Sequence, residues 1–156
     1  MAVKVSKVAE AAGLDAILAS LNVGGAGFIN FYKDNTGLPA NVAAVPPVGY
    51  VVVAKAVFQD TSAAAYHPFG QTSTTSLKAV GALVSGSVAK DINTVAGTTT
   101  WFRMFPFGAD ITLGDTAIMQ GSVGTSGSDI NLTTNILSTG GTLNITAFDV
   151  TIAGMN

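Results

Sequence analysis

The chain has 156 residues, a length that suits one domain with its own core. Only 10% of its residues are charged, against about 25% in an ordinary soluble domain. It has no cysteine, which excludes disulfides, thiolate catalysis and cysteine-ligated metal sites. Its few lysines are scattered and form no basic stripe, and no apolar run reaches the ~20 residues of a membrane span. We therefore expect neither a nucleic-acid partner nor a membrane partner.

Low charge has a second consequence. Apolar residues make up 48% of the chain, and the mean hydropathy is +0.48. Such a chain has few charges to keep it solvated and apart from its neighbours. Either partners cover much of its surface, or serine, threonine and asparagine solvate it. The first alternative predicts a component of a larger assembly.

Residues 5–21 carry the one clear helical pattern. Its apolar positions recur at helical spacing, at Leu14, Ile17, Leu18 and Leu21. Ser6 is suited to cap the N-terminus, and Gly24 follows as a stop. Glu10 and Asp15 interrupt the apolar part, which is not typical of a signal peptide. This stripe needs a partner, either the rest of the chain or another subunit.

After residue 24 the chain changes to β-branched and aromatic runs punctuated by Gly, Asn, Asp and Pro. The expected strands lie at 27–33, 49–58, 77–88, 98–105, 111–123, 129–132 and 142–152. Pro39–Pro47 is at best an edge strand, and residues 60–76 are expected to form a long polar loop. With no alternating helices, the pattern predicts an all-β, antiparallel sandwich of jelly-roll type with one short N-terminal helix.

One domain over 1–156 is expected. In this division, residues 1–24 form a helical arm and residues 25–156 form the sandwich.

Residues suited to chemistry are scarce. His67 is the one histidine and falls in the long loop, where packing is a commoner role than catalysis. Asp110, Asp115 and Asp129 lie in turn-like stretches, where carboxylates usually bond their own backbone. A calcium site built from them is the sharper alternative, but no calcium-loop spacing is present. We expect no enzyme activity, no metal and no cofactor.

The richest cluster of large side chains is residues 101–105, WFRMF. On a strand, Trp101, Arg103 and Phe105 share one face, and Phe102 and Met104 share the other. We expect Phe102 and Met104 in the core. The opposite face is either simple packing or a contact surface, because Trp, Phe and Arg are typical interface anchors.

Together with the helix stripe, this face gives a hypothetical interface. Its residues are Leu14, Leu18, Leu21, Trp101, Arg103 and Phe105. If they contact a partner, Trp101→Asp or Leu18→Asp should abolish binding and leave a folded domain.

The C-terminal half resembles a family of small virion proteins of tailed bacteriophages. The resemblance rests on Gly97–Arg103 (GTTTWFR), Gln120–Leu132 (QGSVGTSGSDINL), Gly140–Thr146 (GGTLNIT) and Phe148–Thr151 (FDVT). It covers residues 97–152, whereas 34–96 match only in style. It implies a capsid-associated β-sandwich, and from it we expect a capsid decoration (cement) protein that binds the outside of the major capsid protein lattice.

On this hypothesis the chain is a dimer or trimer on the virion exterior, after assembly in the host cytoplasm. The alternatives are another virion component, such as a tail, neck or head-fibre protein, and a carbohydrate- or receptor-binding sandwich with Tyr66, Phe69 and Trp101 stacking on sugars.

Overall fold

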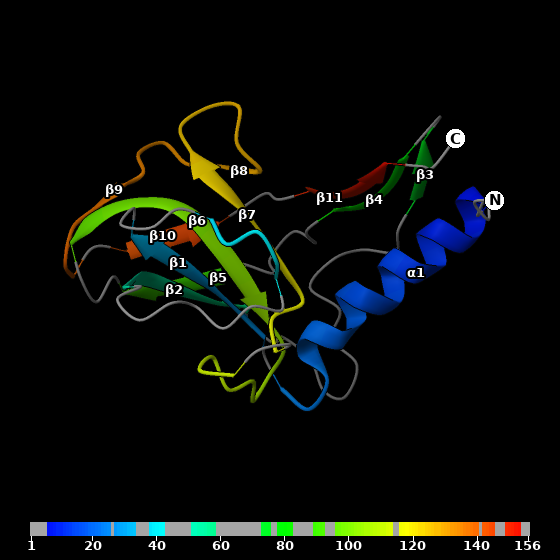
Figure 1. The fold of residues 1–156 in the computed structure, drawn as a ribbon, viewed down its shortest axis with the longest axis horizontal. Coiled ribbons are helices and arrows are strands. Elements are labelled where there is room, and N and C mark those ends of the chain that lie inside the picture. The colour runs from blue at the N-terminus through cyan, green and yellow to red at the C-terminus, as the bar shows by residue number, and fades with distance from the viewer. Residues whose placement is uncertain are drawn as a thin grey trace.

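The computed structural model describes residues 6–25, 27–33, 38–42, 51–58, 73–75, 78–82, 89–92, 96–113, 116–140, 142–145 and 149–153. Across these residues the fold is mainly β, with one α-helix to the side of the sheets (Figure 1). The helical elements are α1 (Lys7–Ala19) and the 3₁₀ turn η1 (Ser20–Asn22). The strands are β1 (Phe28–Lys33), β2 (Val52–Phe58), β3 (Ser73–Thr75), β4 (Lys78–Ala82), β5 (Ala89–Ile92), β6 (Gly97–Phe105), β7 (Met119–Gly124), β8 (Ile130–Asn131), β9 (Ile136–Leu137), β10 (Thr142–Ile145) and β11 (Asp149–Ala153).

The strands form two sheets. The larger has the order β10-β5-β2-β1-β6-β7-β8, with β9 pairing on β6, and the smaller has the order β11-β4-β3. Most pairs are antiparallel, but β7 and β8 run parallel over two register pairs. The larger sheet is therefore mixed, which corrects the prediction of a purely antiparallel arrangement. Strands distant in sequence meet in its middle, since β1 lies between β2 and β6.

Helix α1 begins and ends as its sequence predicts. The Ser6 hydroxyl accepts a hydrogen bond from the backbone N–H of Ala9 at 3.3 Å, so the predicted N-cap is confirmed. The chain leaves η1 through Gly24, whose φ of +85° suits glycine. Helix α1 lies beside β4 and β3 (Figure 1).

The centre of the larger sheet is buried on both faces. One face and the inner side of the helix form a single apolar cluster: Ala11, Leu14, Leu18, Leu21, Ile29, Phe31, Val53, Phe102, Met104, Val123, Ile130 and Leu137. We call the sheet side of this cluster the core face. The predicted burial of Phe102 and Met104 is confirmed. The alternate residues of β1 and β6 lie on the opposite face and are also buried.

Several strands differ from the sequence prediction. The segment 142–152 is not one strand, because β10 joins the larger sheet and β11 joins the smaller one. The loop predicted at 60–76 contains β3, and strands β5 and β9 were not predicted at all. Of Pro39–Pro47, residues 39–42 form no strand, and the remainder lies outside the described residues.

Candidate functional site

The six side chains predicted as an interface are packed inside the chain. Leu18, Leu21 and Trp101 are 0% exposed, and Leu14, Arg103 and Phe105 are at most 2% exposed. The leucines meet the sheet of their own chain, so the partner that the helix stripe needs is the domain itself. The hypothesis of a contact surface at these residues is therefore corrected to a packing role. Trp101→Asp and Leu18→Asp would place a charge in the core and unfold the chain, instead of testing binding.

A polar row crosses the face opposite the core. Register pairs join Lys55 to Asn30, Asn30 to Arg103 and Arg103 to Gln120, so these residues of β2, β1, β6 and β7 stand side by side. The Arg103 Nε donates to the Gln120 side-chain oxygen at 3.1 Å. We call these four residues the polar row. It explains how the chain's single arginine is accommodated at a strand centre.

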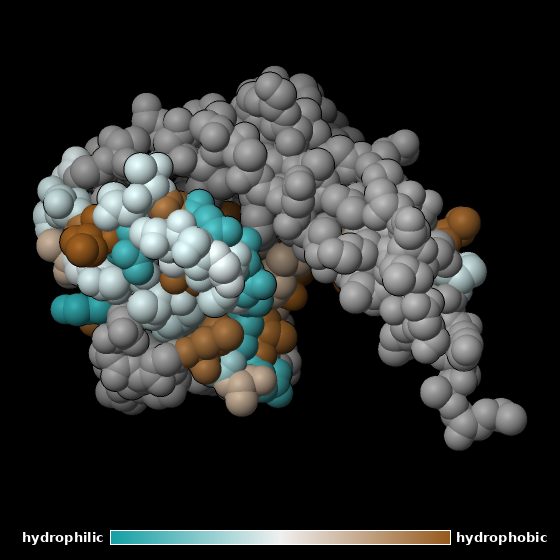
Figure 2. All heavy atoms as spheres, turned by 90° about the horizontal axis from the view of Figure 1, so that it is seen from above, coloured by the Kyte–Doolittle hydropathy of each residue, from teal (hydrophilic) through white to brown (hydrophobic). Residues whose placement is uncertain are grey.

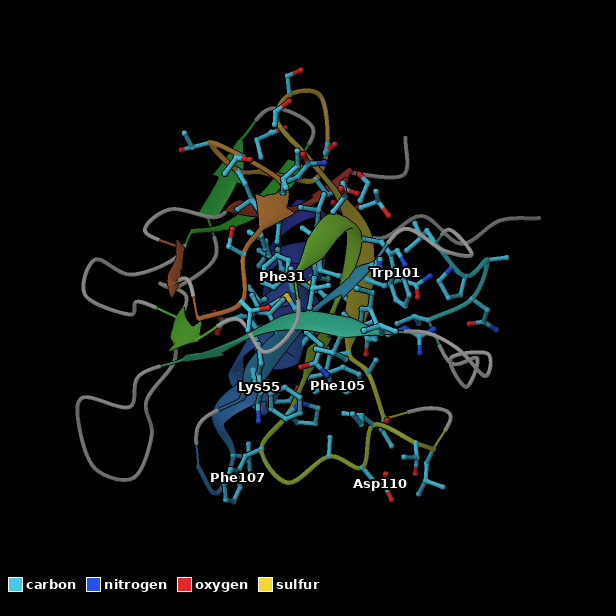
Figure 3. The ribbon with its side chains drawn as sticks, turned by 90° about the vertical axis from the view of Figure 1, so that its left-hand side faces the viewer. Phe31, Lys55, Trp101, Phe105, Phe107 and Asp110 are labelled. Atoms are coloured by element: carbon cyan, nitrogen blue, oxygen red, sulfur yellow. The ribbon has the colours of Figure 1, made fainter. Side chains whose placement is uncertain are left out.

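Residues 38–42 cross this row as a strap. The Arg103 guanidinium donates from Nη2 to the backbone carbonyl of Asn41 at 3.3 Å. The Gln120 amide donates from Nε2 to the backbone carbonyl of Pro39. Figure 3 shows this segment beside Trp101, on the outer side of the sheet. The strap thus covers the sheet face that Arg103 and Trp101 occupy, and we call that face the strap face.

Aromatic pairs flank the row on both sides. Tyr32 and Trp101 are stacked with ring centroids 3.9 Å apart, and Phe28 and Phe105 are stacked at 5.2 Å. The Arg103 guanidinium lies 5.7 Å from the centroid of the Trp101 ring. Burial raises the pKa of the Tyr32 hydroxyl, while a bond with Asn30 and the charge of Arg103 oppose the rise. This is a packed layer and presents no open surface for sugars at Trp101.

Among the described residues, four large apolar side chains are exposed near one end of the sheet, and four others (Val8, Ile17, Leu38 and Ile136) are exposed elsewhere. Near this end Val23 is 72% exposed, Leu113 57%, Phe107 54% and Ile111 37%. Figure 3 shows Phe107 and Asp110 on opposite sides of this end, beyond Phe105. We call the four exposed apolar residues near this end the apolar end. The sequence did not single them out, because Val, Phe, Ile and Leu are more often buried than exposed.

Two contacts position Phe107 within the apolar end. The Phe107 N–H donates to the Leu21 carbonyl at 3.0 Å, which ties the loop after β6 to the end of the helix. The Phe107 ring lies so close to Gly25 that a Cβ there would meet it at 2.6 Å. Only glycine permits this approach, so Gly25 sets how the ring is presented.

Asp110 closes the turn that carries Ile111 and Leu113. Its Oδ1 accepts from the Thr112 backbone N–H at 2.9 Å and from the Thr112 hydroxyl at 2.6 Å. These bonds stabilise the charged form and hold the pKa of the Asp110 carboxyl below its ordinary value. The predicted use of such a carboxylate, bonding within its own turn, is confirmed for this residue.

The string VGTSGSDINL (residues 123–132), which carries much of the family resemblance, forms a turn that is bonded within itself and to the adjacent Ser122. The Asp129 carboxylate accepts from the backbone N–H and the hydroxyl of Ser122, both at 2.8 Å. Asn131 bonds both backbone groups of Ser128 at 3.1 Å. At Gly121 a Cβ would lie 2.7 Å from the Phe102 ring, so the strand needs glycine there. The residues in this string therefore serve local structure.

The described surface is weakly polar over much of its area. Seen from above, residues of intermediate hydropathy dominate, and the apolar ones form small separate patches (Figure 2).

Among the described residues, no group of three or more His, Asp or Glu side chains is placed to hold a metal ion. His67, Tyr66, Phe69 and Asp115 lie outside the described residues. Within the same part of the chain, no helix is both long and apolar enough to cross a membrane. Comparisons of the chain with protein-family models, curated proteins and solved structures found no match.

Proposed function

We propose that the chain is a structural protein of a tailed-phage virion, and specifically a decoration protein that binds the outside of the capsid lattice. The observation that carries the proposal is the apolar end, where Phe107, Leu113 and Val23 are exposed and the backbone of Phe107 is bonded to that of Leu21. A low charge content and the resemblance over residues 97–152 support the same reading. The function requires contact area and no reactive group, so we propose no catalysis and no cofactor.

The finer architecture belongs to this proposal. A jelly-roll-like sandwich of one domain over residues 1–156 would present the apolar end at the tip of its larger sheet. The presence of two sheets supports that arrangement.

The proposed mechanism is linkage between binding and assembly. A protein that binds the intact lattice and not its separated subunits shifts the equilibrium toward the intact particle. At a free concentration ~100-fold above Kd, one site contributes about 2.7 kcal/mol. A dimer or trimer that binds several capsid subunits at once would gain further through effective concentration.

The test mixes purified chain with undecorated, expanded capsids and measures bound copies after sedimentation. We expect saturation at a stoichiometry set by the lattice. Phe107→Asp should weaken binding by at least tenfold, because it places a charge in an apolar contact. The fold should persist, since this side chain is 54% exposed.

The matched control is Ile136→Asp. Ile136 is also exposed, at 66%, but it pairs with the start of β6, whereas Phe107 follows its end. The two sites are roughly 30 Å apart along the strand. Equal binding by wild type and Phe107→Asp would remove the apolar end from the contact. Binding to tails or necks and not to capsids would favour another virion component.

A further inference from the structure

The polar row recognises a peptide backbone. Its two donors, the Arg103 guanidinium and the Gln120 amide, bond the carbonyls of Asn41 and Pro39, which stand two residues apart. Carbonyl recognition of this kind is independent of side-chain identity, as in partners that add a peptide to a sheet. Any copy of the same segment would therefore satisfy these donors equally well.

The strap's own side chains are largely exposed. Leu38 is 45% exposed, Ala40 and Asn41 are exposed, and Pro39 and Val42 are only half-buried. Residues 38–42 belong to neither a helix nor a strand. An element with few buried apolar contacts and side-chain-mediated bonds is among the first to open in a native domain.

We propose that the strap is exchanged between copies, so that residues 38–42 of one chain lie on the polar row of a second chain. The exchanged form keeps the same two bonds and the same covered face, because the occupant is chemically identical. Exchange of an identical element is a low-cost route to a dimer for this reason. The strap face is then an interaction surface whose partner is a second copy of the chain. The proposal does not depend on what the assembled copies bind.

The experiment uses the absence of native cysteine. Ala40→Cys puts a single thiol on an exposed position of the strap, where a benzophenone maleimide can be attached. Equal amounts of this protein with natural and with heavy isotopes are mixed, equilibrated at high concentration and irradiated. Mass spectrometry then measures crosslinks between the strap and residues 101–120.

If straps are exchanged, crosslinks joining a heavy chain to a light chain should be as frequent as crosslinks between chains of the same isotope. Adding Gln120→Ala to the labelled protein should reduce mixed crosslinks at least severalfold, because one carbonyl contact is lost. Ser126→Cys, on an exposed turn remote from the strap, controls for random collisions. Native-like circular dichroism and a cooperative melt of each labelled protein verify its fold.

Crosslinks confined to one chain at every concentration would overturn the proposal, as would mixed crosslinks of equal yield from Ser126→Cys. If the Gln120→Ala protein does not fold, Arg103→Lys in its place keeps the charge and removes the planar guanidinium. Mixed crosslinks unchanged in that variant would also contradict the assignment of the polar row. If the wild-type chain fails to bind capsids but still gives mixed crosslinks, the proposed function is contradicted and the exchange of straps is not.

Discussion

Both faces of the central sheet are largely buried, but they differ in chemistry. The core face, which carries Phe31, Phe102 and Met104, meets other apolar side chains of the same cluster. The strap face carries Arg103 and the Tyr32–Trp101 pair, and residues 38–42 complete its cover. Burial alone therefore does not distinguish the core face, which packs in the apolar cluster, from the strap face, which a short segment covers. We expect the two faces to respond differently to substitution, and four measurements test this.

The largest effect is expected on the core face. Phe102→Ala should lower the free energy of unfolding by about 3–5 kcal/mol, because it removes a ring and leaves a cavity among packed neighbours. Denaturant titration followed by circular dichroism would measure this loss. Phe107→Ala, which truncates an exposed ring, is the control and should cost far less. Equal losses would mean that the core face is not the main source of stability.

On the strap face the decisive residue is Arg103. Arg103→Ala should cost about 1.5–3 kcal/mol, the range for a hydrogen bond made by a charged group. Arg103→Met keeps most of the side-chain volume and should cost less, because the aliphatic packing over Trp101 remains. Lys33→Ala, at an exposed position, provides the baseline in the same unfolding assay. A loss at Arg103 no larger than this baseline would show that the strap contributes nothing.

Space is also more limited on the core side. Gly121→Ala should destabilise the chain by about 1 kcal/mol or more, because its Cβ would lie 2.7 Å from the Phe102 ring. Gly13→Ala is the opposite case, since a Cβ at this position of α1 would meet no neighbouring side chain within 4 Å. It should stabilise by about 0.5–1 kcal/mol. The melting temperature should fall in Gly121→Ala and rise in Gly13→Ala. A shift in the same direction for both variants would contradict this packing.

The smallest effect is a pH dependence confined to the strap face. Burial raises the pKa of Tyr32 above its ordinary value of 10.0, so the folded state retains this proton after the unfolded state has lost it. The stability that this proton contributes to the folded state is fully present below pH 10.0. It is lost as the pH rises from there through the folded-state pKa of Tyr32. Tyr32→Phe should lose stability less steeply in this window. If the free energy of unfolding fell equally with pH in the wild type and in Tyr32→Phe, Tyr32 would lie in a solvated site.

Local patterns in the sequence predicted local structure well. The Ser6 cap, the buried leucines of the helix stripe, strand β1 and the burial of Phe102 follow from spacing and residue type, because each depends on neighbours within a few positions. Ile17, which the predicted stripe also included, is 40% exposed. The division of 142–152 between two sheets depends on partners far along the chain, and no periodicity encodes them.

The candidate site was harder to predict. A row of Trp, Arg and Phe on one face of a strand suits an interface and a second buried layer equally well. Which of the two applies was decided by residues 38–42, which lie 59 or more positions before Trp101 in the sequence. Phe107 and Leu113 carried no distinguishing signal, because Phe and Leu are more often buried than exposed.

The stacking of Trp101 makes the chain its own optical reporter. It is the one tryptophan among 156 residues, so all of the indole signal comes from a single known place. Its ring is held within 5° of parallel to Tyr32, an asymmetric setting that should give a strong near-ultraviolet dichroism band. Because Trp101 lies beside the strap and adjoins Arg103, that band and the emission maximum can follow local opening in real time without an attached dye.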